Sequence, residues 1–518
     1  MKKQTIYFAV FSSGMVTLAV ELAAARLLGA VFGTSNLVWA SIIGLILIYL
    51  TVGYFVGGRI ADRMPEARRF FQVMLLGGFT IGLVPLVARP VLRAAANAFD
   101  QLELGMLLGA FVAVLILFVL PIVLLGMVSP FAIRLAIGDA EHSGQVAGVI
   151  YGVSTLGSFV GTFLPDLLLI PWVGTTRTFL LLSGYLMLVA LAGHWRSEGW
   201  RKTAPLLLLP VATLVMSWLF LRGGIKDSAG MVYETESSYN YIQVLEADGY
   251  RFLRLNEGQG VHSIYHATDL DYDGPWEQFL AGPFFNEPQY LATDLKRIAV
   301  IGLAAGTVAR QATEVFGPVA IDGYEIDGKI IEVGREYFGM TMPNLNAVAV
   351  DGRWGLSHSG EVYSLIAIDA YRPPYIPWHL TTKEFFQMTF DHLAEDGVLV
   401  INVGRAPDDR RLIEVLVATL SEVFPSVHVM DIPNTFNSMV YATKQPTTFD
   451  YLAANLNSLA ASGDTHPLLL DAILTTLTYR QETPIGGQVL TDDHAPVERI
   501  INSMVLRFIF TGDVEGLQ

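Results

Sequence analysis

At 518 residues, the chain is too long for a single hydrophobic core, so we expect two or more domains. It contains no cysteine, which excludes disulfide bonds, thiolate metal ligands and cysteine nucleophiles. A formal net charge of −15 at pH 7 argues against a nucleic-acid partner and suits a cationic substrate, although acidity for solubility alone explains it equally well.

Residues 1–222 consist mainly of long apolar runs and are predicted to form a transmembrane helical domain. A helix needs about 20 apolar residues to cross a bilayer, which predicts about seven helices here. Their approximate ranges are 5–32, 37–57, 70–91, 105–137, 146–170, 178–195 and 204–221. The fourth run contains Pro121 and Pro130, so it is either one kinked helix or a broken pair.

The basic residues of this apolar half predict its orientation, because cytoplasmic loops are enriched in lysine and arginine. One predicted side carries basic residues at positions 2–3, 59–69, 134 and 196–202, and the other carries Arg89, Arg93 and Arg177. This distribution places the amino terminus in the cytoplasm.

Residues 223–287 are predicted to form a small β-rich subdomain. Alternating runs at 241–246 and 250–255 flank Asp248-Gly249, and an Asp-Gly pair between such runs is a strong signal for a β-hairpin. The segment that follows mixes aromatic and acidic residues, among them Tyr265, and is expected either to line a cavity or to form a packed lid. Its histidines and acids are too loosely spaced to predict a metal site.

Residues 288–450 are predicted to form a doubly wound, Rossmann-like α/β domain of the class I methyltransferase type. A short apolar strand runs into a turn with Gly302 and Gly306 and then into a helix, as in nucleotide-binding units. The next three apolar runs are each followed by an acid, at Glu325, Asp351 and Asp369. Parallel strands end at one edge of the sheet, where ligands bind. The pattern therefore predicts a nucleoside pocket at this edge.

Glu325 and Asp351 are the predicted nucleoside ligands. Glu325 lies 19 residues past Gly306, where doubly wound nucleotide sites place a carboxylate that accepts hydrogen bonds from ribose hydroxyls, and Asp327 follows closely. Asp351, followed by Gly352, is placed to accept a hydrogen bond from the exocyclic amine of adenine. For each acid, the alternative is a helix cap or a loop charge.

Asp369 is the candidate reactive group. It ends a buried strand and precedes the segment Ala-Tyr-Arg-Pro-Pro-Tyr, which is expected to cover a ligand. A carboxylate there accepts a proton from an amine, whose lone pair then attacks an electrophilic carbon. The predicted walls, with cation–π contacts, are Tyr371, Tyr375, Trp378 and His379. The alternative is that Asp369 only holds its loop.

Residues 451–518 are expected to form a C-terminal extension.

These residues, in this order, resemble the spermidine synthase (polyamine aminopropyltransferase) family. Over essentially its whole length, the chain is similar to the fused bacterial form, in which a transporter-like membrane domain precedes the synthase. The loop at 58–63 resembles a cytoplasmic loop of major-facilitator transporters. Further segments that carry the likeness are Glu236-Ser-Ser-Tyr-Asn-Tyr-Ile-Gln-Val244, His379-Leu-Thr-Thr-Lys-Glu-Phe385 and Leu490-Thr-Asp-Asp-His-Ala-Pro-Val-Glu498.

The resemblance implies an enzyme that moves an aminopropyl group from decarboxylated S-adenosylmethionine to a polyamine and releases methylthioadenosine. It makes Asp369 the general base, assigns ribose and adenine to Glu325 and Asp351, and places Asn240 where the family has a nucleoside-contacting glutamine. The other residues assigned to the nucleoside are Gly302, Gly306, Asp327 and Gly352, and those assigned to the acceptor are Tyr239, Tyr265, Tyr371, Arg372 and His379. The implied partners are a small-molecule amine and the lipid bilayer, with a homodimer as an option; no metal and no nucleic acid are implied.

Two positions depart from the family pattern. Ala305 stands where the family has an aspartate for the aminopropyl amine, and Arg372 stands where it has a second acid of the reactive loop. Both changes remove negative charge, and Arg372 suits a carboxylate such as that of intact S-adenosylmethionine. Two alternatives therefore stay open: a methyltransferase that uses intact S-adenosylmethionine on a small or membrane-borne acceptor, and a non-catalytic transporter or sensor that binds a nucleoside or polyamine.

The expected location is the bacterial inner membrane, crossed several times. With the amino terminus inside, seven helices would put the synthase-like part outside the cell, where nucleoside cofactors are scarce. On chemical grounds we expect this part in the cytoplasm, which requires an even number of crossings.

Overall fold

The computed structural model describes residues 3–32, 36–100, 105–137, 142–221, 228–256, 260–371, 376–406 and 408–511. The chain divides into two compact units. The first contains residues 1–229, 234–242 and 256–258, and the second contains residues 230–233, 243–255 and 259–518. Each unit is described by itself.

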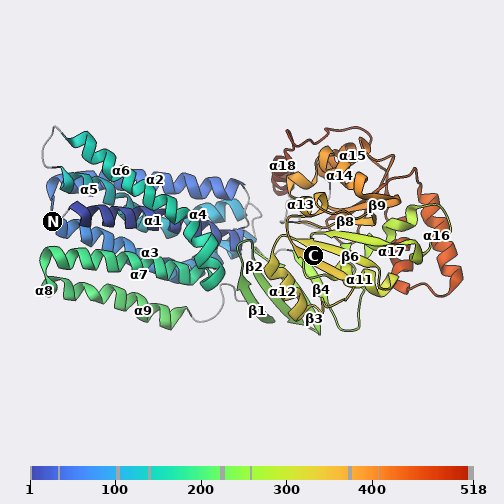
Figure 1. The fold of residues 1–518 in the computed structure, drawn as a ribbon, viewed down its shortest axis with the longest axis horizontal. Helices are drawn as coiled ribbons and strands as arrows, with labels where there is room; N and C mark the ends of the chain where they lie inside the picture. Colours follow the sequence, from blue (N-terminus) through green and yellow to red (C-terminus); the bar gives the residue numbers. More distant parts are fainter. Residues whose placement is uncertain are drawn as a thin grey trace. The chain divides into compact units, whose positions relative to one another are not determined.

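Most of the first unit is helical (Figure 1). Its helices are α1 (Lys3–Phe32), α2 (Asn36–Arg63), α3 (Ala67–Asp100), α4 (Gly105–Gly126), α5 (Val128–Ala136), α6 (Ser143–Leu164), η1 (Pro165–Leu169), α7 (Ile170–Glu198), α8 (Trp200–Thr203), η2 (Ala204–Leu207) and α9 (Leu208–Phe220). Among the described residues, six helical stretches are long and apolar enough to cross a membrane. One of them, Ser143–Glu198, is 56 residues long and contains both α6 and α7, which explains the difference from the predicted count of about seven. The backbone inside this stretch leaves the helical conformation at Gly174, where φ is +81°.

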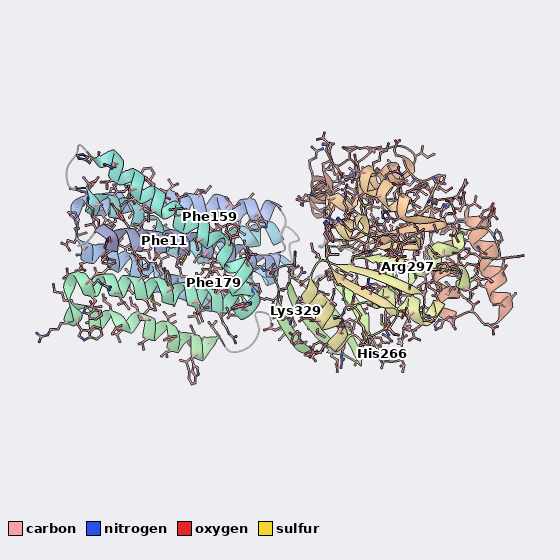
Figure 2. All side chains as sticks on the ribbon, viewed as in Figure 1. Phe11, Phe159, Phe179, His266, Arg297 and Lys329 are labelled. Atoms are coloured by element: carbon pink, nitrogen blue, oxygen red, sulfur yellow. The ribbon has the colours of Figure 1, made fainter. Side chains whose placement is uncertain are left out.

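Small residues let the helices of this unit approach closely. A Cβ atom added at Gly14, Gly157 or Gly161 would lie within 2.3 Å of a backbone oxygen on the facing helix, so α1 and α6 pack backbone to backbone. Large apolar side chains also lie on the outside of the unit: Phe179 is buried, whereas Phe159 is exposed (Figure 2). Exposed apolar side chains on long apolar helices are typical of a lipid-facing surface.

A small antiparallel sheet of order β1-β2-β3-β4 follows the helices. Its strands are β1 (Met231–Glu236), β2 (Tyr241–Ala247), β3 (Tyr250–Leu255) and β4 (Val261–Tyr265). The predicted hairpin joins β2 and β3, and both turn residues adopt positive φ, +52° at Asp248 and +86° at Gly249. This geometry matches the right-handed twist of the flanking strands and explains the Asp-Gly pair.

The core of the second unit is an eight-stranded mixed sheet of order β12-β10-β11-β9-β8-β5-β6-β7. Its strands are β5 (Arg297–Ile301), β6 (Ala320–Glu325), β7 (Leu345–Ala349), β8 (Tyr363–Ile368), β9 (Leu393–Gly404), β10 (Ser426–Asp431), β11 (Asn437–Thr443) and β12 (Arg480–Gln481). The five strands from β9 to β7 pair in parallel, whereas the pairings β9–β11, β11–β10 and β10–β12 are antiparallel. The chain runs outward from β5 through β6 to β7 and then returns to β8 on the other side of β5. The order thus reverses between β5 and β8, the point where ligands bind in such sheets.

Helices cover both faces of this sheet, as expected for a doubly wound fold (Figure 1). One face packs against α11 (Thr307–Phe316), α12 (Gly328–Tyr337), α16 (Phe449–Ser462), α17 (Pro467–Thr478) and η3 (Phe279–Phe285). The other packs against α13 (Gly352–Ser357), α14 (Lys383–His392), α15 (Arg411–Ser421) and α18 (Val497–Thr511). The short helices α10 (Pro275–Gln278), η4 (Ala292–Asp294) and η5 (Trp378–Leu380) lie in the connections. Alternate residues of β5 enter the two cores, which is why the strand reads as a continuous apolar run.

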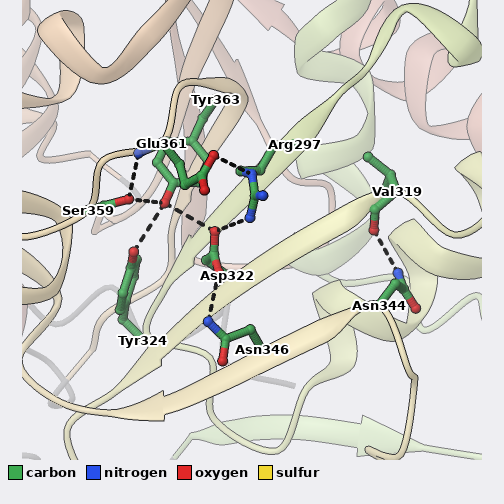
Figure 3. Close-up of polar contacts among 9 residues, drawn as sticks. All are labelled: Arg297, Val319, Asp322, Tyr324, Asn344, Asn346, Ser359, Glu361 and Tyr363. Atoms are coloured by element: carbon green, nitrogen blue, oxygen red, sulfur yellow. Dashed lines mark hydrogen bonds and ion pairs between the residues drawn. The ribbon is translucent and has the colours of Figure 1, made fainter.

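A polar network around the buried Asp322 joins the parallel strands near their amino-terminal ends (Figure 3). Asp322 of β6 accepts hydrogen bonds from Arg297 of β5 at 2.8 Å, Asn346 of β7 at 2.9 Å and Tyr363 of β8 at 3.2 Å. Removing one partner of such a network leaves a buried charge unsatisfied and is costly. The network therefore fixes four strands relative to one another at the edge opposite the predicted pocket.

Candidate active site

The turn after β5 requires both of its glycines. Gly302 has a φ of +85°, and a Cβ atom there would lie 2.5 Å from the carbonyl oxygen of Asp369. Gly306 has a φ of +89°, and its Cβ would collide with Met340 at 2.6 Å. Any larger residue would push the turn away from the end of β8 or from the segment that follows α12. The turn therefore lies directly against the segment that carries Asp369.

Glu325 is the last residue of β6, and its carboxylate faces this turn. Oε2 accepts a hydrogen bond from the amide of Ala304 at 2.9 Å, and Oε1 accepts one from the amide of Asp327 at 3.1 Å. The residue is 8% exposed, and burial raises the pKa of its carboxyl group to about 7. Asp327, not Glu325, caps the following helix, since it accepts from the amide of Lys329 at 3.0 Å. The helix-cap alternative therefore applies to Asp327, and Glu325 remains at the edge as a buried acceptor.

Asp351 follows β7 and combines two contacts. Its Oδ1 accepts from the amide of Trp354 at 3.0 Å and caps α13, while its Oδ2 lies 2.9 Å from Nε2 of His379 in η5. The hydrogen bond with His379, together with the backbone donor, lowers the pKa of Asp351 against the opposing effect of burial. A Cβ atom at Gly352 would lie 2.4 Å from Ile301, so the first turn of α13 packs on the end of β5. This contact brings Asp351 to the same edge as the glycine turn.

Asp369 directly follows β8. Its amide donates to the carbonyl of Ile301 at 2.9 Å, and its Oδ1 accepts from Nδ2 of Asn402 at 2.9 Å. Burial raises the pKa of Asp369 to about 6, and the Asn402 hydrogen bond opposes that shift. The hydroxyl of Tyr371 accepts a hydrogen bond from the amide of Gly404. Arg372 and Tyr375 lie outside the described residues.

Asn402 was not among the predicted site residues. It lies in the buried strand β9, is 4% exposed, and directs its amide towards Asp369. Within the described residues, its Oδ1 is buried without a hydrogen-bond partner. The signal in the sequence was one amide side chain inside the apolar run Val-Leu-Val-Ile-Asn-Val-Gly, because a polar residue in a buried strand needs a partner.

Three other predicted residues lie elsewhere. The ring of Tyr265 lies below the Arg310 guanidinium, 4.6 Å from ring centroid to guanidinium carbon. Tyr239 and Asn240 belong to the first unit, where Asn240 accepts from Asn256 at 2.8 Å. Strand β4, which ends at Tyr265, does reach the glycine turn after β5, since the hydroxyl of Ser263 accepts a hydrogen bond from the amide of Ala305 at 3.0 Å.

The edge of the sheet where the parallel strands end thus carries three acids, which differ in burial and in pKa. Glu325 is buried and Asp369 is partly buried, both with a raised pKa, whereas Asp351 is partly buried with a lowered pKa. A buried acceptor next to backbone amides suits sugar hydroxyls, and a carboxylate that titrates near pH 6 suits proton transfer at neutral pH. In the part of the chain that the structure describes, no three histidines or acids are grouped as metal ligands.

Residues 284–451 match the family model of the Spermine/spermidine synthase domain. This segment is a spermine/spermidine synthase domain. A probable polyamine aminopropyl transferase of Bifidobacterium longum is 30% identical over 285 residues, which cover 52% of this chain and 61% of that protein. A polyamine aminopropyltransferase of Vibrio vulnificus is 26% identical over 280 residues, which cover 51% of this chain and 90% of that protein.

Two solved structures are similar to this chain: a spermidine synthase from Thermotoga maritima and a probable spermidine synthase from Corynebacterium glutamicum. The first is 19% identical with a TM-score of 0.35, and the match covers 54% of this chain and 88% of that chain. The second is also 19% identical, with a TM-score of 0.39, and the match covers 51% of this chain and 99% of that chain. The synthase domain contains all three edge acids and Asn402, whereas Asn240 and Tyr265 precede it.

Proposed function

We propose that the chain is a membrane-bound transferase that moves an aminopropyl group from decarboxylated S-adenosylmethionine to a polyamine acceptor. The observation that carries the proposal is the set of three acids at one sheet edge inside a spermine/spermidine synthase domain. Glu325 accepts hydrogen bonds from the ribose hydroxyls, Asp351 accepts one from the adenine amine, and Asp369 accepts a proton. Two similar proteins, from Bifidobacterium longum and Vibrio vulnificus, are named polyamine aminopropyltransferases, which supports this reaction class.

In the reaction, the acceptor nitrogen forms a bond to the aminopropyl carbon next to the sulfonium. The carbon–sulfur bond breaks, and its electron pair returns to sulfur, which leaves neutral methylthioadenosine. The surplus proton on nitrogen passes to Asp369. Because Asn402 engages Oδ1, Oδ2 is the oxygen that accepts this proton.

The remaining assignments complete the proposal. The turn glycines, Gly302 and Gly306, admit the nucleoside close to the backbone, with Asp327 and Gly352 around it. Tyr265 and Tyr371 contact the acceptor amine, and Arg372, which is a cation, suits a carboxylate of the substrate. Ala305 leaves the aminopropyl amine without the carboxylate that the family resemblance leads one to expect, and it is 2% exposed. That apolar position is the specific observation that favours a second candidate, a methyltransferase that uses intact S-adenosylmethionine.

Turnover with the two donors distinguishes these functions. The purified full chain, in detergent or lipid discs, is incubated with putrescine or spermidine and either donor, and the products are analysed by mass spectrometry. We expect methylthioadenosine and the aminopropylated amine in equal amounts from decarboxylated S-adenosylmethionine only. A methylated product together with S-adenosylhomocysteine would favour the methyltransferase, and binding of either donor without any product would favour the non-catalytic sensor or transporter.

We further propose that the apolar helices span the inner membrane of a bacterium and that the synthase domain lies in the cytoplasm, where the donor is made. The chain lacks cysteine, so single cysteines report accessibility directly. In intact cells, Glu66→Cys and Ser462→Cys should both be protected from an impermeant maleimide, and both should react once the membrane is permeabilised. Both side chains are exposed. Reaction of Ser462→Cys from outside would overturn the cytoplasmic placement.

A further inference from the structure

Two segments that are far apart in the sequence meet beside Asp351. They are the segment that begins at His379 and the C-terminal segment Leu490–Glu498. The amide of Lys383 donates to the carbonyl of Leu490 at 2.9 Å. Thr382 donates to Oδ1 of Asp492 at 2.7 Å, and the amide of Asp492 donates to Glu384 at 2.9 Å. The function proposed above uses none of these C-terminal contacts.

Arg353 joins Asp492 to the nucleoside edge. Its guanidinium makes two parallel hydrogen bonds to the Asp492 carboxylate, Nη1 to Oδ1 at 2.7 Å and Nη2 to Oδ2 at 2.6 Å. Such fork-to-fork pairs are the most geometrically specific of the charged hydrogen bonds. The same Nη1 also donates to the carbonyl oxygen of His379 at 3.1 Å. One guanidinium therefore holds the C-terminal segment and the backbone of η5 at the same time.

His379 in turn contacts Asp351. With its backbone held by Arg353, the imidazole places Nε2 2.9 Å from Oδ2 of Asp351. Arg353 lies in the first turn of α13, the helix that Asp351 caps. The Asp351 carboxylate is thus fixed from two directions, by the helix start and by the histidine, and both depend on Arg353.

We infer that Asp492 is a positioning residue for purine recognition: through Arg353 it places His379 on Asp351 and so fixes the direction of the carboxylate that accepts the adenine amine. The inference rests on the proposed nucleoside site. It gives the C-terminal extension a role in choosing the base of the nucleoside, and Asp492 does this without touching the ligand itself.

The test compares two nucleosides that differ at one position. Methylthioadenosine carries the exocyclic amine, and methylthioinosine carries a carbonyl oxygen in its place. Calorimetry with the full chain gives both dissociation constants. The preference is expressed as the dissociation constant of methylthioinosine divided by that of methylthioadenosine. In Asp492→Asn, we expect this ratio to fall by about fivefold to tenfold, because the Asp351 carboxylate stays present and its hydrogen bond to the adenine amine is weakened rather than lost. The loss should come from weaker binding of methylthioadenosine, with methylthioinosine unchanged.

Two further variants sharpen the result. Asp493→Asn removes the same charge from the neighbouring exposed residue and should leave the ratio unchanged. Asp492→Glu keeps the carboxylate and should restore part of the preference, which also covers failure of the asparagine variant to fold. An unchanged ratio in Asp492→Asn, or an equal loss of affinity for both nucleosides, would overturn the positioning role. Failure of the unaltered protein to bind either nucleoside would instead reject the proposed function beneath it.

Discussion

Replacing Asp369 by asparagine is expected to reduce kcat by about 10²- to 10⁴-fold, the usual contribution of a positioned general base. The substitution keeps the size of the side chain and removes its ability to take a proton from the amine. The affinity for methylthioadenosine should stay within about twofold, because a base that acts on the amine contributes to the chemical step rather than to nucleoside binding. Release of methylthioadenosine under saturating substrates measures the effect, with Asp464→Asn, an exposed acid on the same unit, as the matched control.

The pH profile supplies an independent readout of the same residue. Burial raises the pKa of Asp369 to about 6, so the fraction in the proton-accepting form grows as the pH rises through that value. The rate should therefore increase up to about pH 7 and then level off, and this rise should be absent from Asp369→Asn. An unchanged profile, or full activity in the variant, would remove Asp369 from the role of base.

Replacing Glu325 by glutamine is expected to weaken methylthioadenosine binding by about 100-fold, because hydrogen bonds to a charged acceptor contribute about 1.5–3 kcal/mol. The amide also places an NH₂ group against one of the two backbone donors, Ala304 and Asp327. The affinity for 2′,3′-dideoxyadenosine, which lacks the ribose hydroxyls, should change by less than about threefold. Calorimetry with both ligands measures the difference, and Glu332→Gln, an exposed acid of α12, is the control.

The protonation of Glu325 gives this prediction a second signature. With its pKa raised to about 7, part of the unliganded population carries a proton at neutral pH. Hydroxyl donors favour the ionised carboxylate, so nucleoside binding should release a proton and should tighten between pH 6 and pH 8. Equal losses of affinity for both ligands in Glu325→Gln would show that the residue supports the turn and does not contact ribose.

The positions of the edge residues could be predicted from the sequence because they follow from local rules. A strand that ends in a glycine turn, and strands that end in an acid, place Gly302, Glu325, Asp351 and Asp369 at one edge once the sheet is parallel. The Asp-Gly hairpin follows from turn chemistry in the same way. Each of these features depends on only a few neighbouring residues.

The partners of these residues could not be predicted, because they depend on long-range packing. Arg353 and Asp492 are 139 residues apart, and only the fold shows that they pair. Asn402 contacts Asp369 across two neighbouring strands, and the register that brings them together is not visible in either segment alone. The number of membrane crossings is likewise not fixed by the sequence, since α6, the π-helical turn Pro165–Leu169 and α7 follow one another as one apolar helical stretch that leaves the helical conformation at Gly174.

The most direct test of the account is a structure of the full chain with methylthioadenosine, by cryo-electron microscopy or crystallography. We predict density at the edge of the sheet where the parallel strands end, with the ribose hydroxyls within hydrogen-bond distance of Glu325, the adenine amine at Asp351 and the methylthio group towards Asp369. An empty edge at saturating nucleoside, or a nucleoside bound elsewhere, would contradict it.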